Sequence, residues 1–164
     1  MTKASYRILF VCMGNICRSP AGEAVFLSRL QTTDFADQVL VDSAGTIGYH
    51  ADSPADARMQ VHAARRGYQL LSRARQVAAA DFDQFDLIIA MDRDNLTDLE
   101  SRYPRDARSQ LRLFCDFVAE HAPVTDVPDP YYGGDAGFER VLDLLEDGVN
   151  GLLDYVAQQV KRGA

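Results

Sequence analysis

Short apolar runs alternate with longer segments of helical periodicity along this chain, and no other feature of the sequence restricts its fold as strongly. Strands that alternate with helices are joined by right-handed crossovers, which produce a parallel sheet. Four runs have the length and the β-branched or aromatic content of buried strands. They are residues 6–11 (YRILFV), 39–45 (VLVDSAG), 85–91 (FDLIIAM) and 111–114 (LRLF). We therefore predict an α/β fold, a three-layer sandwich with a four-stranded parallel sheet and helices on both faces.

Helices are expected between these runs and after the last one. Their ranges are 18–31, 54–67, 92–103 and about 136–161. Pro20 falls in the first turn of the first helix, where its missing N–H does no harm. Asp92 is a candidate N-cap, and Gly67 is a candidate for the glycine that ends the second helix.

Length and charge narrow the class of protein. The 164 residues suffice for one domain, which we place at 1–164. No apolar run approaches the roughly 20 residues that cross a membrane, and the first residues enter a strand without a secretory signal, so we expect a cytoplasmic protein. The formal net charge of −7 argues against nucleic acid or anionic membrane as a partner. We expect a monomer, with a weak dimer as the alternative.

The segment CMGNICRS, residues 12–19, lies between the first predicted strand and the first helix. Such a loop can curl so that successive backbone N–H groups point inward and bind an anion, helped by the positive end of the helix dipole. Gly14 and Asn15 are residue types that tolerate the positive φ of a tight loop. The loop can therefore bind phosphate in an otherwise acidic protein.

Two side chains of this loop have the chemistry for phosphoryl transfer. At the N-terminus of a helix Cys12 is favoured as a thiolate, which is the nucleophilic form, and Ser19 can donate its hydroxyl to it. Arg18 carries a planar fork that matches two phosphate oxygens. A tight structural turn with a buried cysteine does not explain Arg18, because a cation at a helix N-terminus is unfavourable unless an anion binds there.

The other cysteines need a separate interpretation. Three cysteines are too few for a disulfide framework, and their spacing does not fit a zinc site. Cys115, in the apolar stretch LRLFCDFV, is expected to pack as a small core residue. Cys17 either packs beneath the loop or closes a reversible disulfide with an oxidised Cys12 and so protects it. We expect neither a metal nor an organic cofactor.

The segment FVCMGNICRSPAGEAVF (10–26) resembles the signature of the low-molecular-weight protein tyrosine phosphatases, in which Cys-x5-Arg is followed by Ser-Pro. The resemblance continues in order through SAGT (43–46), RARQV (73–77), IIAMDRDNL (88–96) and DPYYGG (129–134). It implies the four-stranded parallel sheet and the hydrolysis of phosphotyrosine in protein substrates without a metal.

The same resemblance implies roles for individual residues. Cys12 matches the nucleophile, Arg18 the phosphate clamp and Asp129 the general acid. The remaining matches are with the phosphate-binding backbone (Met13, Gly14, Asn15, Ile16, Cys17, Arg18), with the aromatic rim beside the acid (Tyr131, Tyr132) and with a serine that holds Asn15 (Ser43). Two positions depart from the family pattern. Many members carry a histidine where Ser72 stands, and some carry a tryptophan where Tyr49 faces the substrate ring.

The sequence favours Asp129 as the acid without this resemblance as well. An aryloxide departs slowly unless it is protonated, so a carboxylic acid from another part of the chain has to reach it. Pro128 and Pro130 stiffen the backbone around Asp129, and the two tyrosines that follow can line a slot for an aromatic ring. The alternative is a surface turn. The neighbouring acids are interpreted as solvated loop residues (Asp116, Asp126) and a helix cap (Asp92).

Two other functions could use the same features. A thiol-dependent arsenate reductase can share the fold and the anion loop, but it needs a relay of further cysteines, and Cys115 is the sole candidate beyond the loop. A phosphotyrosine-binding module without turnover needs neither a nucleophile nor an acid, and this chain has both. The sequence therefore predicts a phosphatase that forms a phosphocysteine.

Overall fold

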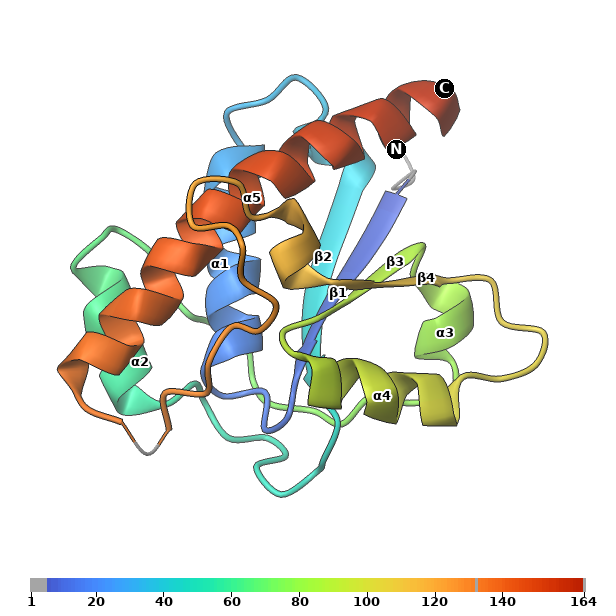
Figure 1. Ribbon diagram of the computed structural model, residues 1–164. Coiled ribbons are helices and arrows are strands. Elements are labelled where there is room, and N and C mark those ends of the chain that lie inside the picture. Colours follow the sequence, from blue (N-terminus) through green and yellow to red (C-terminus); the bar gives the residue numbers. More distant parts are fainter. Residues whose placement is uncertain (1–5, 132, 164) are drawn as a thin grey trace.

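The computed structural model of the protein describes residues 6–131 and 133–163 (Figure 1). Its strands are Tyr6–Cys12 (β1), Val39–Gly45 (β2), Leu87–Ala90 (β3) and Gln110–Leu113 (β4). Its α-helices are Arg18–Leu30 (α1), Ala57–Ala64 (α2), Asp81–Gln84 (α3), Arg93–Arg102 (α4) and Asp135–Gly163 (α5), and its 3-10 helices are Ala36–Gln38 (η1) and Phe114–Phe117 (η2). The four predicted strands are all present.

Within the described residues, the strands form a parallel sheet in the order β2-β1-β3-β4. In its register, Val11 of β1 pairs with Ala44 of β2 on one side and with Ala90 of β3 on the other. The carboxyl ends of the two central strands therefore lie side by side at one edge of the sheet, which is where ligands bind in sheets of this kind.

The side chains of β1 alternate between two apolar layers. Ile8 and Phe10 belong to the apolar layer with α1, α2 and α5, whereas Leu9 and Val11 belong to the layer with α3 and α4. Figure 1 shows these two sets of helices on opposite faces of the sheet. All four side chains are fully buried. Because both faces of the sheet are covered by helices, the predicted fold class is confirmed.

Two helices differ from the prediction. α2 begins at Ala57 rather than at Pro54, because Asp56 caps it by accepting hydrogen bonds from two backbone N–H groups of its first turn. Gly67, with a φ of 90°, lies in the turn that follows α2. The short helix α3 is not predicted, since a segment of 4 residues is too short to show helical periodicity.

Helix α5 is the longest, with 29 residues, and it packs against α1 along the Ile8 face of the sheet (Figure 1). Its buried residues recur at helical spacing and include Val141, Leu145, Val149 and Val156. Among the helices of residues 6–131 and 133–163, α5 included, none is both long and apolar enough to cross a membrane.

Candidate active site

The loop of residues 12–18 runs from the end of β1 to the N-terminus of α1, as predicted. Asn15 takes the positive φ that curls this loop, at 58°, whereas Gly14 does not. The Asn15 side chain is held at both ends: its Nδ2 donates to the Ser19 Oγ at 2.8 Å, and its Oδ1 accepts from the Arg75 backbone N–H at 3.0 Å. These two bonds hold the loop in its curled form.

The bond to Arg75 comes from an extended strap, residues 73–77, that runs beside the end of β2. The N–H of Gly45 donates to the Arg75 carbonyl, and the Val77 N–H donates to the Gly45 carbonyl, each at 2.8 Å. The Arg75 guanidinium also pairs with Asp42 and Asp81. The strap therefore ties the phosphate loop to the edge of the sheet.

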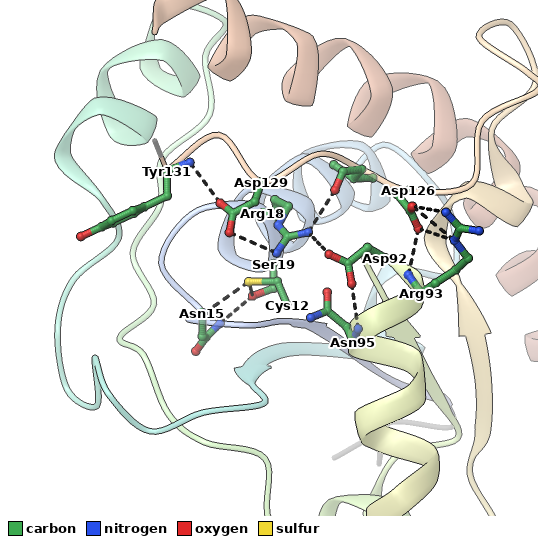
Figure 2. Close-up of polar contacts among 11 residues, drawn as sticks. Cys12, Asn15, Arg18, Ser19, Asp92, Arg93, Asn95, Asp126, Asp129 and Tyr131 are labelled. Atoms are coloured by element: carbon green, nitrogen blue, oxygen red, sulfur yellow. Dashed lines mark hydrogen bonds and ion pairs between the residues drawn. The ribbon is translucent and has the colours of Figure 1, made fainter. Parts of the chain in front are cut away.

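Cys12 lies at the bottom of the loop with 2% of its surface exposed. Its sulfur lies 3.0 Å from the Ser19 Oγ and accepts a hydrogen bond from the Asn15 backbone N–H at 3.3 Å (Figure 2). Hydroxyl and N–H donors in these positions stabilise a thiolate, which makes Cys12 suited to nucleophilic attack.

Arg18 is buried beside Cys12, and its guanidinium lies between two carboxylates (Figure 2). Nη1 donates to Asp92 Oδ2 at 2.6 Å and to the Val127 carbonyl at 3.0 Å, and Nη2 lies 3.6 Å from Asp129 Oδ2. Burial alone would lower the pKa of Arg18, but the negative charges of Cys12, Asp92 and Asp129 outweigh it and raise the pKa. The guanidinium therefore stays charged where a phosphate would bind.

Asp92 serves two structural purposes at once. Its Oδ1 accepts from the backbone N–H of Asn95 at 2.7 Å and so caps α4, which confirms the predicted cap. Its Oδ2 holds Arg18. The sequence favours the cap, and the structure shows in addition that Asp92 contacts Arg18.

Asp129 lines the same cleft as Cys12 and Arg18. Its side chain is 37% exposed, and its Oδ1 accepts from the Tyr131 backbone N–H at 3.0 Å. The carboxyl group can therefore reach both a substrate in the cleft and the surrounding water, which is what a residue that donates and later accepts a proton requires.

The cleft has a volume of about 270 Å³. Its lining consists of Cys12, Met13, Gly14, Ile16, Cys17, Arg18, Ile47, Tyr49, His50, Asp129 and Tyr131. All the predicted site residues are in this set except Asn15, whose side chain bonds to Ser19 and Arg75, Ser19 itself, Ser43, and Tyr132, which is outside the described residues. Ile47 and His50 also line the cleft, although no sequence motif singles them out. Both residues follow β2, the strand next to β1, and this position alone could have indicated that they lie near the phosphate loop.

Aromatic rings form the outer wall of the cleft. His50 lies edge-on to Tyr49 with ring centroids 4.8 Å apart, and its ring is 6.2 Å from that of Tyr131. Arg58 supports Tyr131 from behind, because its guanidinium donates to the Tyr131 carbonyl at 2.9 Å and lies 5.4 Å from the ring centroid. The wall is therefore suited to a flat aromatic group.

Ser43 does not hold Asn15. Its hydroxyl donates to Glu23 of α1 at 2.7 Å, because Ser43 pairs with Phe10 in the sheet and so lies below the level of the loop. Ser72 also bonds to Glu23. Burial raises the pKa of this carboxyl group, and the two serines partly oppose that effect.

Asp126 is likewise not a solvated loop residue, since it bonds to Arg93 at the start of α4. Asp116 pairs with Arg112 on the surface.

Cys115 is buried as predicted, and burial raises its pKa to about 11. Burial also raises the pKa of Cys17. No cluster of three or more metal-ligating side chains occurs in the part of the chain that the structure describes.

Known proteins match this architecture along most of the chain. The model of the family described as low molecular weight phosphotyrosine protein phosphatase matches residues 7–162. A low molecular weight protein-tyrosine-phosphatase of Streptomyces coelicolor is 43% identical over 160 residues, which cover 96% of this chain and 97% of the relative. The human low molecular weight phosphotyrosine protein phosphatase is 38% identical over 141 residues, which cover 85% and 88% of the two chains.

Solved structures agree with this match. A protein tyrosine phosphatase from Entamoeba histolytica, crystallised with Hepes in its active site, has a TM-score of 0.89 at 44% identity and covers 94% of this chain and 98% of its own. A Drosophila arginine phosphatase has a TM-score of 0.82 at 29% identity, with coverages of 91% and 96%. None of these relatives is described as an arsenate reductase, so that alternative is not supported. With its fold and its Cys-x5-Arg loop, the chain belongs to the low molecular weight phosphotyrosine protein phosphatase family of hydrolases.

Proposed function

We propose that this protein hydrolyses phosphotyrosine in protein substrates through a phosphocysteine formed at Cys12. One observation carries the proposal: Cys12, Arg18 and Asp129 line the same cleft, although Asp129 comes from a distant part of the chain. A nucleophile, a clamp for phosphate and a proton donor on one cleft are the groups that phosphoryl transfer to a thiolate needs.

In the first step the Cys12 thiolate attacks phosphorus in line with the leaving phenolic oxygen. Arg18 and the loop N–H groups hold the remaining phosphate oxygens. The bond from sulfur to phosphorus forms as the bond from phosphorus to the phenolic oxygen breaks. Asp129 gives its proton to that oxygen, so that a neutral phenol leaves.

In the second step a water molecule attacks the phosphocysteine. Asp129 is now a carboxylate and takes a proton from this water as its oxygen bonds to phosphorus. The bond from sulfur to phosphorus breaks and inorganic phosphate is released. Ser19 and the Asn15 N–H, which contact the sulfur, stabilise the departing thiolate and return the site to its starting form.

The walls of the cleft support an aryl phosphate as the substrate. Tyr49, His50 and Tyr131 surround its mouth, and the side chain of Ile16 adds apolar surface near the bottom. Because an arginine phosphatase shares the fold, the leaving group has to be tested directly.

The test is the rate at which the purified chain dephosphorylates matched peptides that carry phosphotyrosine, phosphoserine or phosphoarginine. We expect hydrolysis of the phosphotyrosine peptide with a preference of at least about a hundredfold. Comparable rates on phosphoserine, or faster hydrolysis of phosphoarginine, would contradict the proposed substrate. An arsenate-dependent oxidation of thioredoxin would instead support the reductase.

We also infer that residues 1–164 act as a single phosphatase domain and as a monomer. The family match over residues 7–162 supports the first point. Light scattering at several protein concentrations tests the second, and a mass that rises toward a dimer would contradict it. A cytoplasmic location and the lack of a cofactor requirement stay predictions from the sequence.

A further inference from the structure

The general acid lies on a segment without regular structure. Residues 118–131 form neither helix nor strand, so individual contacts have to fix the position of Asp129. The Val127 N–H donates to the Met91 carbonyl at 2.9 Å, and the Val127 carbonyl accepts from Arg18. These bonds attach Val127 to the end of β3 and to Arg18. They do not by themselves fix the course of the chain from Val127 to Asp129.

A second attachment comes from Asp126. Its Oδ1 accepts from the Arg93 backbone N–H at 2.9 Å, and its Oδ2 lies 3.0 Å from Nη2 and 3.3 Å from Nε of the Arg93 guanidinium (Figure 2). Burial would raise the pKa of Asp126, but the bonds from Arg93 outweigh it and lower the pKa. Asp126 is therefore a carboxylate that Arg93 holds by both its backbone and its side chain.

The N-terminus of α4 thus binds two carboxylates that lead to different parts of the site. Asp92 connects it to Arg18, and Asp126 connects it to the segment that carries Asp129 (Figure 2). Arg18 and Asp129 approach each other to 3.6 Å between these two attachments. The N-terminus of α4 is therefore connected both to Arg18, which clamps the phosphate, and to the segment that carries Asp129, the proton donor.

We propose that the Arg93–Asp126 pair positions Asp129 for proton transfer to the leaving group. Both residues are positioning residues, because neither lines the active-site cleft. The inference rests on the proposed function, in which Asp129 is the acid.

The alternative is that the pair only stabilises the fold. Arg93 and Asp126 have side chains that are 69% and 35% exposed, and ion pairs this exposed add little to stability. Position matters far more to proton transfer, since a displacement of about 1 Å can lower a rate by about a hundredfold. The proposal therefore requires that loss of the Arg93–Asp126 pair changes the stability of the fold little but slows proton transfer from Asp129 strongly.

The test compares Arg93→Ala and Asp126→Ala with wild type on phenyl phosphate and p-nitrophenyl phosphate. Protonation matters more for phenoxide, the more basic leaving group. We expect kcat on phenyl phosphate to fall about tenfold, a smaller fall on p-nitrophenyl phosphate, and an unchanged inhibition constant for inorganic phosphate. Arg93→Ala keeps the backbone N–H that Asp126 accepts, so it remains informative if Asp126→Ala fails to fold.

Two further variants complete the design. Asp116→Ala breaks the exposed Arg112–Asp116 pair and is the matched control, for which we expect wild-type rates. In an Asp129→Ala background, Arg93→Ala should cause no further fall in kcat on phenyl phosphate. Unchanged rates in Arg93→Ala, equal losses on the two substrates, or a further loss in the Asp129→Ala background would overturn the proposal. If Asp129→Ala itself lacks the leaving-group dependence, the proposed function has failed, and the inference fails with it.

Discussion

Asp92 holds the Arg18 guanidinium with one carboxylate oxygen, at 2.6 Å, and caps α4 with the other. The Arg18 side chain is only 3% exposed, so it depends mainly on protein groups for its hydrogen bonds. Without Asp92, the remaining acceptor of Arg18 Nη1 among the described residues is the Val127 carbonyl. The guanidinium would then be free to turn toward Asp129.

Replacing Asp92 should therefore affect activity more than stability. We predict that Asp92→Ala lowers kcat/KM by about tenfold or more, because Arg18 loses its orientation, and lowers the free energy of unfolding by about 1 kcal/mol, the usual value of an N-cap. Asp92→Asn keeps a cap and should recover much of the stability but little of the activity. Near-wild-type kinetics in both variants would show that Asp92 is only a cap.

Asp129→Ala should leave phosphate binding intact while slowing proton transfer. The expected loss in kcat is about 10²–10⁴-fold, the usual size of a general-acid contribution. It should be larger on phenyl phosphate than on p-nitrophenyl phosphate. Losses of equal size on the two substrates would mean that Asp129 supports the structure rather than the chemistry.

Cys17 is predicted to protect Cys12 from irreversible oxidation. Both cysteines line the cleft and both are free thiols in the structure. Peroxide converts the Cys12 thiolate to a sulfenic acid, which can condense with the Cys17 thiol to a disulfide and release water. Peroxide should therefore inactivate the wild type, and a dithiol reductant should restore it.

The matched variant is Cys17→Ser, in which Cys12 has no neighbouring thiol and can proceed to the sulfinic acid. Recovery of this variant after peroxide should be much poorer than that of the wild type. If the two proteins recover equally, Cys17 only packs beneath the loop.

Local sequence signals were enough to predict the sheet and the phosphate loop. The apolar run of β1 and the positive φ of Asn15 are local properties of the chain, whereas the bonds from Asn15 to Arg75 and from Arg18 to Asp92 join residues far apart in the sequence and could not be predicted from it. Asp126 and Ser43 were misinterpreted because their partners, Arg93 and Glu23, lie far away in the sequence. The start of α2 was misplaced because Pro54 and Asp56 are both start signals, and only the hydrogen bonds distinguish them.

Asp147 of α5 fixes a turn near the start of residues 118–131, the segment that carries Asp129. Its carboxylate accepts from the backbone N–H groups of Ala119, Glu120 and His121 and also contacts the His121 ring at 2.8 Å. Its side chain is 4% exposed. Burial would raise the pKa of Asp147, but the bonds from His121 and the backbone outweigh it and lower the pKa to about 2.

This lowered pKa predicts a stability that depends on pH. Since the folded value lies below the unfolded value of about 3.9, the contribution of Asp147 is complete above about pH 4 and is lost as the pH falls through about 2. We expect roughly 2 kcal/mol from this group. Urea unfolding of wild type and Asp147→Asn at about pH 5 and about pH 2 measures it. A difference between the two proteins that does not shrink in acid would contradict the prediction.

The phosphocysteine is the central claim, and trapping it is the most direct test. Asp129→Ala should accumulate the intermediate on p-nitrophenyl phosphate, because that leaving group departs without help while hydrolysis lacks its base. Acid quenching followed by peptide mass analysis should locate one phosphoryl group on Cys12. Cys12→Ser should form no such adduct and retain less than about a hundredth of the wild-type rate. A phosphoryl group on another residue, or turnover in Cys12→Ser close to that of the wild type, would contradict the mechanism.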